Sequence, residues 1–124
     1  MGYSLKKDFS FPKEQRLLKT KEYRASFDKG FKFLTPAFVF FAQQSVRPRL
    51  GLVVSRKVGN AVCRNKIKRL LRESYRNLTA KPDYDLVVVA RSRSKSSSLS
   101  EVSKTLCWSL AKIQTLMNKA QERA

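Results

Sequence analysis

The fold of this chain is set by one stretch of its sequence, LGLVVSRKVGNAVCRNKIKRLLRESYRN, which spans residues 50–77. Residues 50–55 are almost wholly apolar, which is typical of a strand that is covered on both faces. Residues 60–77 then change to helical spacing, and Asn60 is a suitable N-terminal cap. At ~100° per residue, one side of this helix carries Cys63, Ile67, Leu70, Leu71 and Ser74. A buried strand followed by such a helix predicts a layered fold of helices on a sheet.

The other side of the same helix is basic. The residues on that side and its flanks are Arg64, Asn65, Lys66, Lys68, Arg69, Arg72 and Arg76. Residues 47–76 hold ten basic residues and a single acidic one, Glu73. A solvated helix face usually mixes Glu with Lys four residues apart, whereas a row of like charges repels itself. We therefore predict that an anion binds this face, and arginine favours phosphate because it donates two parallel hydrogen bonds.

The composition indicates the same kind of partner. The chain has 124 residues, of which 42% are hydrophobic, and a formal net charge of +18. This length predicts one domain, and this charge predicts a polyanion, with nucleic acid favoured over an anionic membrane surface. The chain lacks an apolar signal core at its start and any stretch of ~20 apolar residues. We therefore expect a cytoplasmic protein.

Several catalytic classes are excluded by residue types that the chain lacks. It has no His, which rules out Ser-His pairs, Cys-His pairs and imidazole metal ligands. Its two cysteines, Cys63 and Cys107, are 44 positions apart, so they form no Cys-x-x-Cys motif. The two could form one disulfide, but we expect both to be reduced thiols in the core, because each stands among apolar residues in the sequence. The acidic residues are scattered, so we predict no catalytic and no metal site made by the protein alone.

Local signals predict the remaining elements. Pro36 marks an edge or a break in the strand region, and Ser98 with Glu101 has the spacing of a capping box. In chain order, the predicted segments are an irregular basic stretch (1–19), a helix (20–30), one or two strands (31–41), a strand (50–55), the basic helix (60–77), a strand (85–90), a Ser-rich loop (92–97), a last helix, and a frayed tail (119–124). This order predicts an α+β two-layer sandwich within one domain over 1–124.

Aromatic and apolar residues form a second candidate site. Tyr23 and Phe27 lie one turn apart on the first helix, and Val39 and Phe41 share one face of a strand. Residues with this spacing are most often core. The alternative is an exposed platform on which unpaired bases stack beside basic side chains. The basic side chains considered for it are Arg56, Lys57 and Arg91.

Residues 57–73, KVGNAVCRNKIKRLLRE, closely resemble the signature of the bacterial ribonuclease P protein subunit. The segments RLLK (16–19), LGLVVSR (50–56) and DLVVVAR (85–91) fall in that family's order, so the resemblance covers roughly residues 9–118. It implies a protein cofactor of a ribozyme that removes the 5′ leader from precursor tRNA. It also implies an α-β-β-β-α-β-α order, a mixed sheet of about four strands, and a left-handed crossover through the basic helix.

The resemblance further implies roles for individual residues. The catalytic RNA would be contacted by Lys57, Asn60, Arg64, Asn65, Lys66, Lys68, Arg69, Arg72 and Arg76. The single-stranded leader would be contacted by Tyr23, Phe27, Val39, Phe41, Arg56 and Arg91. Lys66 stands where Arg is common, and Tyr23 stands where Phe is frequent. The Mg²⁺ ions of the reaction would be held mainly by the RNA and none by the protein alone.

The expected partners are therefore the catalytic RNA and precursor tRNA, with no membrane and no protein partner required. Two other functions fit the composition: a small ribosomal or RNA-chaperone protein, and a nucleoid protein that coats DNA without sequence preference. Co-purification separates the three functions, because each predicts a different nucleic acid in the complex.

Overall fold

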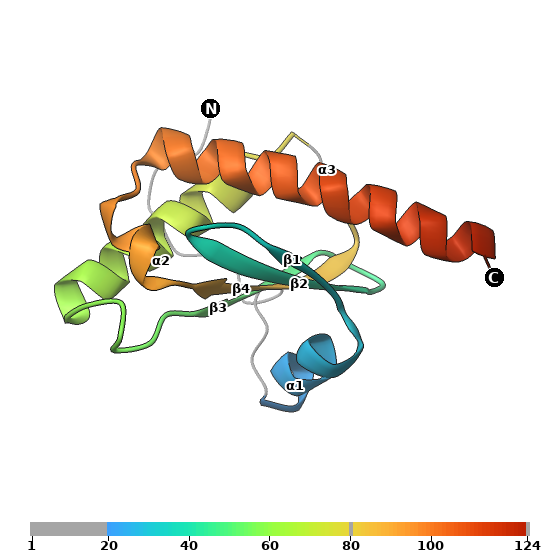
Figure 1. Cartoon of the computed structure of the whole chain (residues 1–124), viewed down its shortest axis with the longest axis horizontal. Helices are drawn as coiled ribbons and strands as arrows, with labels where there is room; N and C mark the ends of the chain where they lie inside the picture. The colour runs from blue at the N-terminus through green and yellow to red at the C-terminus, as the bar shows by residue number, and fades with distance from the viewer. Residues whose placement is uncertain (1–19, 80, 124) are drawn as a thin grey trace.

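The computed structural model describes residues 20–79 and 81–123. In chain order its elements are α1 (Thr20–Lys29), β1 (Phe31–Leu34), β2 (Phe38–Gln44), β3 (Arg49–Val53), α2 (Ala61–Arg76), β4 (Tyr84–Ala90), a short 3₁₀ helix η3 (Ser92–Ser96) and α3 (Leu99–Arg123). The predicted order of helices and strands is confirmed (Figure 1). The Ser-rich segment, which we expected to be a plain loop, contains η3. The expected irregular segment 1–19 lies outside the described residues.

The four strands form one mixed sheet in the order β1-β2-β4-β3. The pairs β1–β2 and β2–β4 are antiparallel, and β3 pairs with β4 in parallel. Helix α2 is the crossover between the two parallel strands, and the predicted left hand of this crossover stays a prediction. Of the two alternatives for Pro36, an edge or a break, the break is confirmed, because Pro36 lies between β1 and β2. There the Thr35 hydroxyl donates to the Phe38 carbonyl at 2.8 Å and accepts from the Phe38 amide at 3.0 Å.

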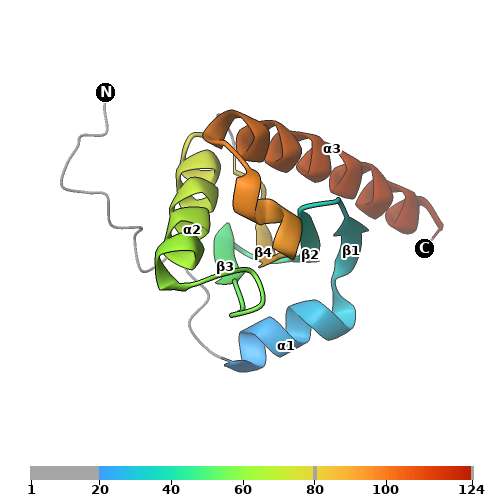
Figure 2. The same cartoon turned by 60° about the vertical axis from the view of Figure 1, so that its left-hand side comes forward.

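The main core lies between the sheet and the two longer helices. In β2 the residues that face this core, Phe38, Phe40 and Ala42, are at most 1% exposed, and the residues between them are half-buried. Helices α2 and α3 cover this face of the sheet, and the short helix α1 lies on the other face (Figures 1 and 2). Burying both faces explains why the central strand β4 is apolar on both.

Side-chain caps fix where the helices begin. The Asn60 side chain accepts a hydrogen bond from the Cys63 amide at 2.9 Å, as predicted for the start of α2. The predicted capping box also forms, because the Ser98 amide donates to the Glu101 carboxylate and the Glu101 amide donates to the Ser98 hydroxyl. Helix α3 continues to Arg123, so residues 119–123 are helical rather than frayed as expected. Buried Met117 anchors this end, and no Gly or Pro follows it.

The two cysteines differ from the expectation. Both thiols are free, but Cys63 is half-buried and Cys107 is exposed. Cys107 follows buried Leu106 on α3, and one step of ~100° turns it away from the core. The prediction of a core thiol is therefore wrong for Cys107, because apolar neighbours in sequence are not its neighbours in space.

A partly buried ion pair holds β3 to β4. Arg49 donates from Nε and Nη2 to the two carboxylate oxygens of Asp85 at 2.8 and 2.7 Å. The two residues face each other in the parallel ladder, and their side chains are only 17% and 12% exposed. Arg49, one of the ten basic residues counted over 47–76, is therefore part of the fold.

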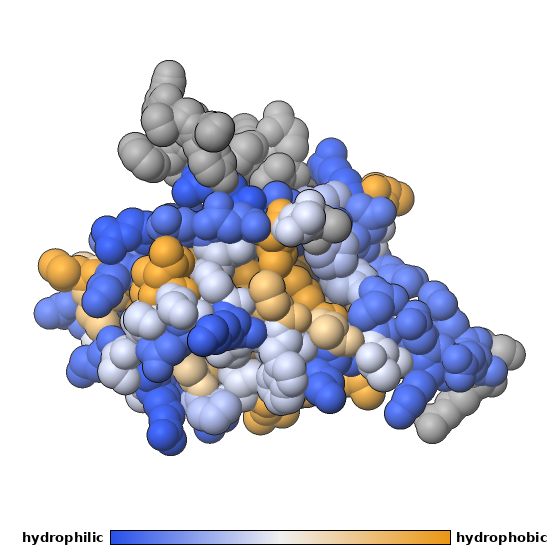
Figure 3. All heavy atoms as spheres, turned by 90° about the horizontal axis from the view of Figure 1, so that it is seen from above, coloured by the Kyte–Doolittle hydropathy of each residue, from blue (hydrophilic) through white to orange (hydrophobic). Residues whose placement is uncertain are grey.

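The surface on the α3 side is mainly polar. Seen from that side, hydrophilic side chains dominate, and apolar ones form a band near the middle, a patch to its left and small patches at the rim (Figure 3). Among the described residues, no helix is both long and apolar enough to cross a membrane.

Candidate RNA-binding surfaces

The first candidate surface is the basic side of α2, which we call the α2 basic face. It consists of Arg64, Asn65, Lys66, Lys68, Arg69, Arg72 and Arg76. The helix buries Ile67, Leu70, Leu71, Ser74 and Tyr75 on its other side. The one-sided charge pattern read from the sequence is therefore confirmed as a one-sided helix with its apolar side in the core.

The members of the α2 basic face are not equally accessible. Asn65, Lys66 and Arg69 are exposed, and the other four side chains are half-buried. Arg64 also donates from Nε to the Gly59 carbonyl at 3.2 Å, which braces the loop before the helix. The most accessible cations of this face are therefore Lys66 and Arg69, with Lys57 exposed in the preceding loop.

Electrostatics favour an anion at this helix. Within residues 20–79 and 81–123, the structure places no carboxylate at ion-pair distance from Lys66, Lys68 or Arg69. The backbone N–H groups at the start of α2 contribute a positive potential. The first turn contains no acidic residue that would offset it. Asn60 has a structural role here, because its side chain is the cap of this turn.

The second candidate surface lies on the opposite face of the sheet, beside α1. The rings of Phe27 on α1 and Phe41 on β2 meet edge to face, with centroids 4.9 Å apart and planes at 78°. Phe27 is 41% exposed and Phe41 is half-buried. Lys32 places its ammonium 5.8 Å from the Phe41 centroid. The structure therefore brings together two of the predicted leader-binding aromatics and adds a cation that the sequence analysis did not select.

Gly30 makes this contact possible. A Cβ at Gly30 would lie 2.4 Å from the Ser26 carbonyl oxygen and 3.0 Å from that of Ala42. Only glycine permits so close an approach, so it both ends α1 and holds the helix against β2. Tyr23 lies one turn before Phe27 on the same helix and is half-buried.

Next to the aromatic pair runs an apolar row that crosses all four strands. Pairing places Leu34 beside Val39, Val39 beside Val89, and Val89 beside Val53. The whole row faces the α1 side, and all four side chains are at least partly exposed, Leu34 by 56%. We call the aromatic pair and this row the α1-side platform. Sequence reasoning found Val39 and missed the other three, because only the strand register reveals them.

Two arginines predicted for the leader lie at one edge of this platform. Arg56 follows β3 and Arg91 follows β4, and the carboxyl ends of parallel neighbours share one sheet edge. Both side chains are exposed. Arg91 donates from Nη1 to the Thr35 carbonyl at 3.1 Å, which fixes it next to the β1–β2 turn. Arg56 and Lys57 belong to the loop that leads into α2, so this basic loop connects the edge of the platform to the α2 basic face.

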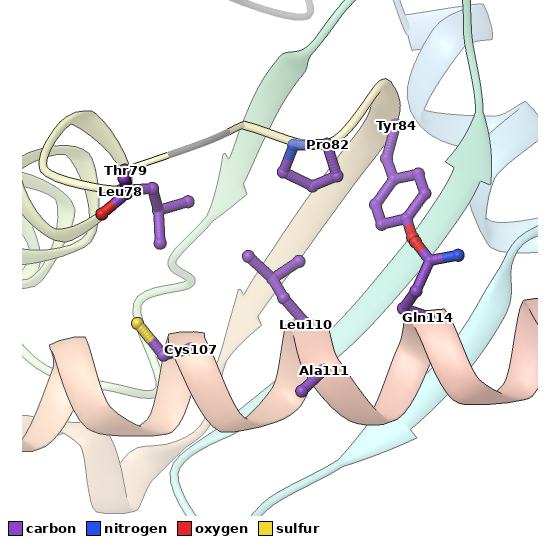
Figure 4. Close-up of a pocket in the computed structure, with 8 residues that line it drawn as sticks. All are labelled: Leu78, Thr79, Pro82, Tyr84, Cys107, Leu110, Ala111 and Gln114. Carbon is purple, nitrogen blue, oxygen red and sulfur yellow. The ribbon is translucent and has the colours of Figure 1, made fainter.

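A separate pocket of about 350 Å³ lies between α3 and the start of β4. Its lining residues are Leu78, Thr79, Pro82, Tyr84, Cys107, Leu110, Ala111 and Gln114 (Figure 4). The Tyr84 hydroxyl donates to the Gln114 side-chain oxygen and closes one end. Burial raises the pKa of Tyr84, so it stays a neutral donor. None of the residues predicted to bind RNA lines this pocket.

Metal ligands do not gather on the described part of the chain. Within it, no three His, Cys, Asp or Glu side chains come together. Asp85, the one buried carboxylate among the described residues, has both oxygens engaged by Arg49. The described residues therefore offer no multidentate carboxylate cluster for Mg²⁺.

Comparison with known proteins gives one consistent match. The family model Ribonuclease P matches residues 11–114 of this chain. A Ribonuclease P protein component of Shouchella clausii is 44% identical over 99 residues, which is 76% of this chain and 81% of that protein. Its counterpart in Oceanobacillus iheyensis is 36% identical over 111 residues, which is 86% of this chain and 92% of that protein.

Solved structures agree with the sequence matches. A mutant of the Staphylococcus aureus RNase P protein, described as defective in mRNA degradation activity, has a TM-score of 0.76 and 30% identity, over 82% of this chain and 90% of its own. The RNase P protein from Thermotoga maritima has a TM-score of 0.67 and 29% identity, over 74% of this chain and 91% of its own.

Proposed function

The chain belongs to the ribonuclease P protein family, and we propose on that basis that it is the protein subunit of a ribonuclease P. In this role it binds the catalytic RNA through the α2 basic face and the unpaired 5′ leader of precursor tRNA over the α1-side platform. The complex, in the cytoplasm, hydrolyses the phosphodiester at the leader junction and leaves a 5′ phosphate on the mature tRNA.

The observation that carries the RNA contact is the basic face of α2, on which Glu73, one turn after Arg69, is the one acidic residue of the helix. Its apolar side is fixed in the core, so its basic side is held toward solvent as one rigid surface. Lys66 and Arg69 are exposed, and no carboxylate among the described residues neutralises them. Rigid, unpaired cations suit a phosphate backbone, because binding releases counterions at little conformational cost.

The leader contact is supported by the α1-side platform. Stacking on aromatic side chains accepts any base, and a leader whose sequence varies needs a surface of that kind. The half-exposed Phe27–Phe41 pair offers ring surface, and the apolar row beside it offers width for a further base. Arg56 and Arg91 at its edge supply charge for the leader phosphates.

The hydrolytic step itself is assigned to the RNA. The protein has no His, and the described residues form no cluster of carboxylates for acid-base work or for Mg²⁺. Mg²⁺ held by the RNA would supply the activated water and stabilise the leaving oxygen. The protein residues bind and orient the RNA and the leader. The ribosomal and nucleoid alternatives lose their support, because the family match covers most of the chain.

The salt dependence of RNA binding tests the α2 assignment. Lys66→Ala with Arg69→Ala removes two exposed cations, and each lost phosphate contact lowers the slope of log K against log salt by roughly one. Arg47→Ala is the matched control, because Arg47 is exposed in the loop before β3, at the other end of that strand from Arg56. We expect the double variant to lose about two units of slope and the control less than one. Equal slopes in a folded double variant would refute the assignment.

A further inference from the structure

Helix α3 exposes the only tryptophan of the chain. Trp108 is 54% exposed, although an indole normally buries most of its large apolar surface. It lies on a stripe of exposed residues spaced three or four apart along the helix: Lys104, Trp108, Lys112, Thr115 and Lys119. The stripe is separate from the side of α3 that enters the core, which carries Val102, Leu106, Ile113 and Met117.

The indole is held in place without being buried. Its ring meets Phe33 of β1 edge to face, with centroids 5.3 Å apart and planes at 67°. The Lys112 ammonium lies 5.6 Å from its centroid. The aromatic contact with Phe33 and the cation–π contact with Lys112 restrict the indole while much of its surface stays exposed. A base can therefore stack on the indole with little further loss of side-chain entropy.

The residues one turn before and one turn after Trp108 are both cationic. Lys104 lies one turn before it and Lys112 one turn after it, and the described residues place no carboxylate at ion-pair distance from either. On the same side of the helix, the Glu101 carboxylate accepts the Ser98 amide as part of the cap. An aromatic ring between two such lysines complements a base and its two flanking phosphates.

The position of Trp108 makes it independent of both surfaces described above. Phe33, which supports it, belongs to the edge strand β1, whereas β3, which leads into α2, forms the other edge of the sheet. Helix α3 also covers the face of the sheet opposite α1 (Figures 1 and 2). A leader lying on the α1-side platform is therefore on the far side of the sheet from Trp108.

We propose that Trp108, with Lys104 and Lys112, forms a third RNA contact that stacks one unpaired nucleotide. The nucleotide comes either from the catalytic RNA or from the precursor tRNA outside its leader, since the two offer the same chemistry. The naming of these two RNAs rests on the proposed function. The stacking itself does not, because any unpaired base has a ring to stack.

Intrinsic fluorescence tests this contact directly, since Trp108 is the only indole in the chain. The full-length protein is titrated with a single-stranded oligonucleotide, with the catalytic RNA, and with precursor tRNA in separate arms. We expect saturable quenching by the oligonucleotide and by at least one of the two RNAs, and the arm that quenches identifies the source. Quenching by none of the three would overturn the proposal.

Variants separate stacking from other causes of quenching. Lys104→Gln with Lys112→Gln keeps the fluorophore, and we expect its oligonucleotide slope against log salt to fall by about 1.4, at ~0.7 per contact for a single strand. Trp108→Leu should weaken binding of the quenching RNA roughly tenfold, and Trp108→Phe should weaken it less. Val46→Ala is the control for loss of exposed apolar surface, because Val46 is a 95% exposed apolar residue between β2 and β3, outside α3.

Three results contradict the proposal. Trp108→Leu and Val46→Ala having equal effects would make Trp108 a general apolar contact. A fluorescence per protein molecule that changes with protein concentration in the absence of RNA would make Trp108 part of a self-association surface. Unchanged binding by Trp108→Leu, alongside weakened binding by the α2 double variant, would refute this contact while the proposed function stands. Oligonucleotide quenching without any binding of the catalytic RNA would support the Trp108 contact and refute the proposed function.

Discussion

Replacement of Phe27 by Ala separates the two roles that this residue has in the structure. The side chain packs its edge against Phe41, yet 41% of the residue is exposed. A fully buried Phe→Ala change costs about 3–5 kcal/mol. Because about three-fifths of Phe27 is buried, we expect the free energy of unfolding to fall by about 2–3 kcal/mol.

The same change removes one stacking surface from the α1-side platform. Loss of one base–aromatic contact is worth about 1–3 kcal/mol, so the dissociation constant of the complex for precursor tRNA should rise roughly tenfold. Mature tRNA has no leader, and its affinity should not change. The assay is denaturant unfolding of the free protein, together with titration of the assembled complex with both tRNAs.

Phe31→Ala is the control for lost stability. Phe31 is also half-buried and aromatic, but it packs into the core on the other face of the sheet. We expect it to lower stability by a comparable amount and to affect the two tRNAs equally. If Phe27→Ala also weakens both tRNAs equally, Phe27 is only a core residue and the leader assignment fails.

Three further predictions concern stability and thiol chemistry. Burial, with smaller contributions from Asp85 and Asp83, raises the pKa of Tyr75 from 10.0 to about 12. As the pH rises, the unfolded chain therefore loses this proton before the folded protein does. The free energy of unfolding should keep its full value below about pH 10 and fall by about 2–3 kcal/mol toward pH 12. Tyr75→Phe should lack that part of the decline in alkaline unfolding curves, and identical curves would contradict this pKa. Breaking the Arg49–Asp85 pair by Arg49→Ala should lower the free energy of unfolding by about 3 kcal/mol, and replacing both partners by apolar residues should lower it less. Equal losses of stability in thermal unfolding would show that the Asp85 carboxylate is not destabilising when its partner is removed. Cys107 should react with a thiol reagent much faster than half-buried Cys63 in the native protein, without loss of RNA binding; mass spectrometry showing equal labelling would contradict the difference in exposure between the two thiols.

Local patterns were sufficient for much of the fold. The spacing of Ile67, Leu70 and Leu71 predicted which side of α2 enters the core, and Asn60 predicted where the helix begins. Pro36 predicted the break between two strands. These features depend on residues within a few positions of each other, where helical and strand periodicity are direct consequences of backbone geometry.

Features that depend on distant segments were not predictable from one sequence. Arg49 and Asp85 are 36 positions apart and meet only because β3 and β4 are paired in parallel. The apolar row of the α1-side platform requires the register of all four strands. The exposure of Trp108 depends on how α3 is rotated over the β1 edge. The residues next to it in the sequence do not indicate this rotation.

The most direct test of the account is the rate of leader removal from precursor tRNA at low Mg²⁺ concentration. The catalytic RNA is measured alone, with the protein, and with the Lys66→Ala/Arg69→Ala variant, and the protein is also measured without RNA. We predict that the protein raises the rate well above that of the RNA alone, that the variant does so only at higher concentration, and that the protein alone cleaves nothing. An unchanged rate with the protein present, or cleavage by the protein alone, would contradict the account.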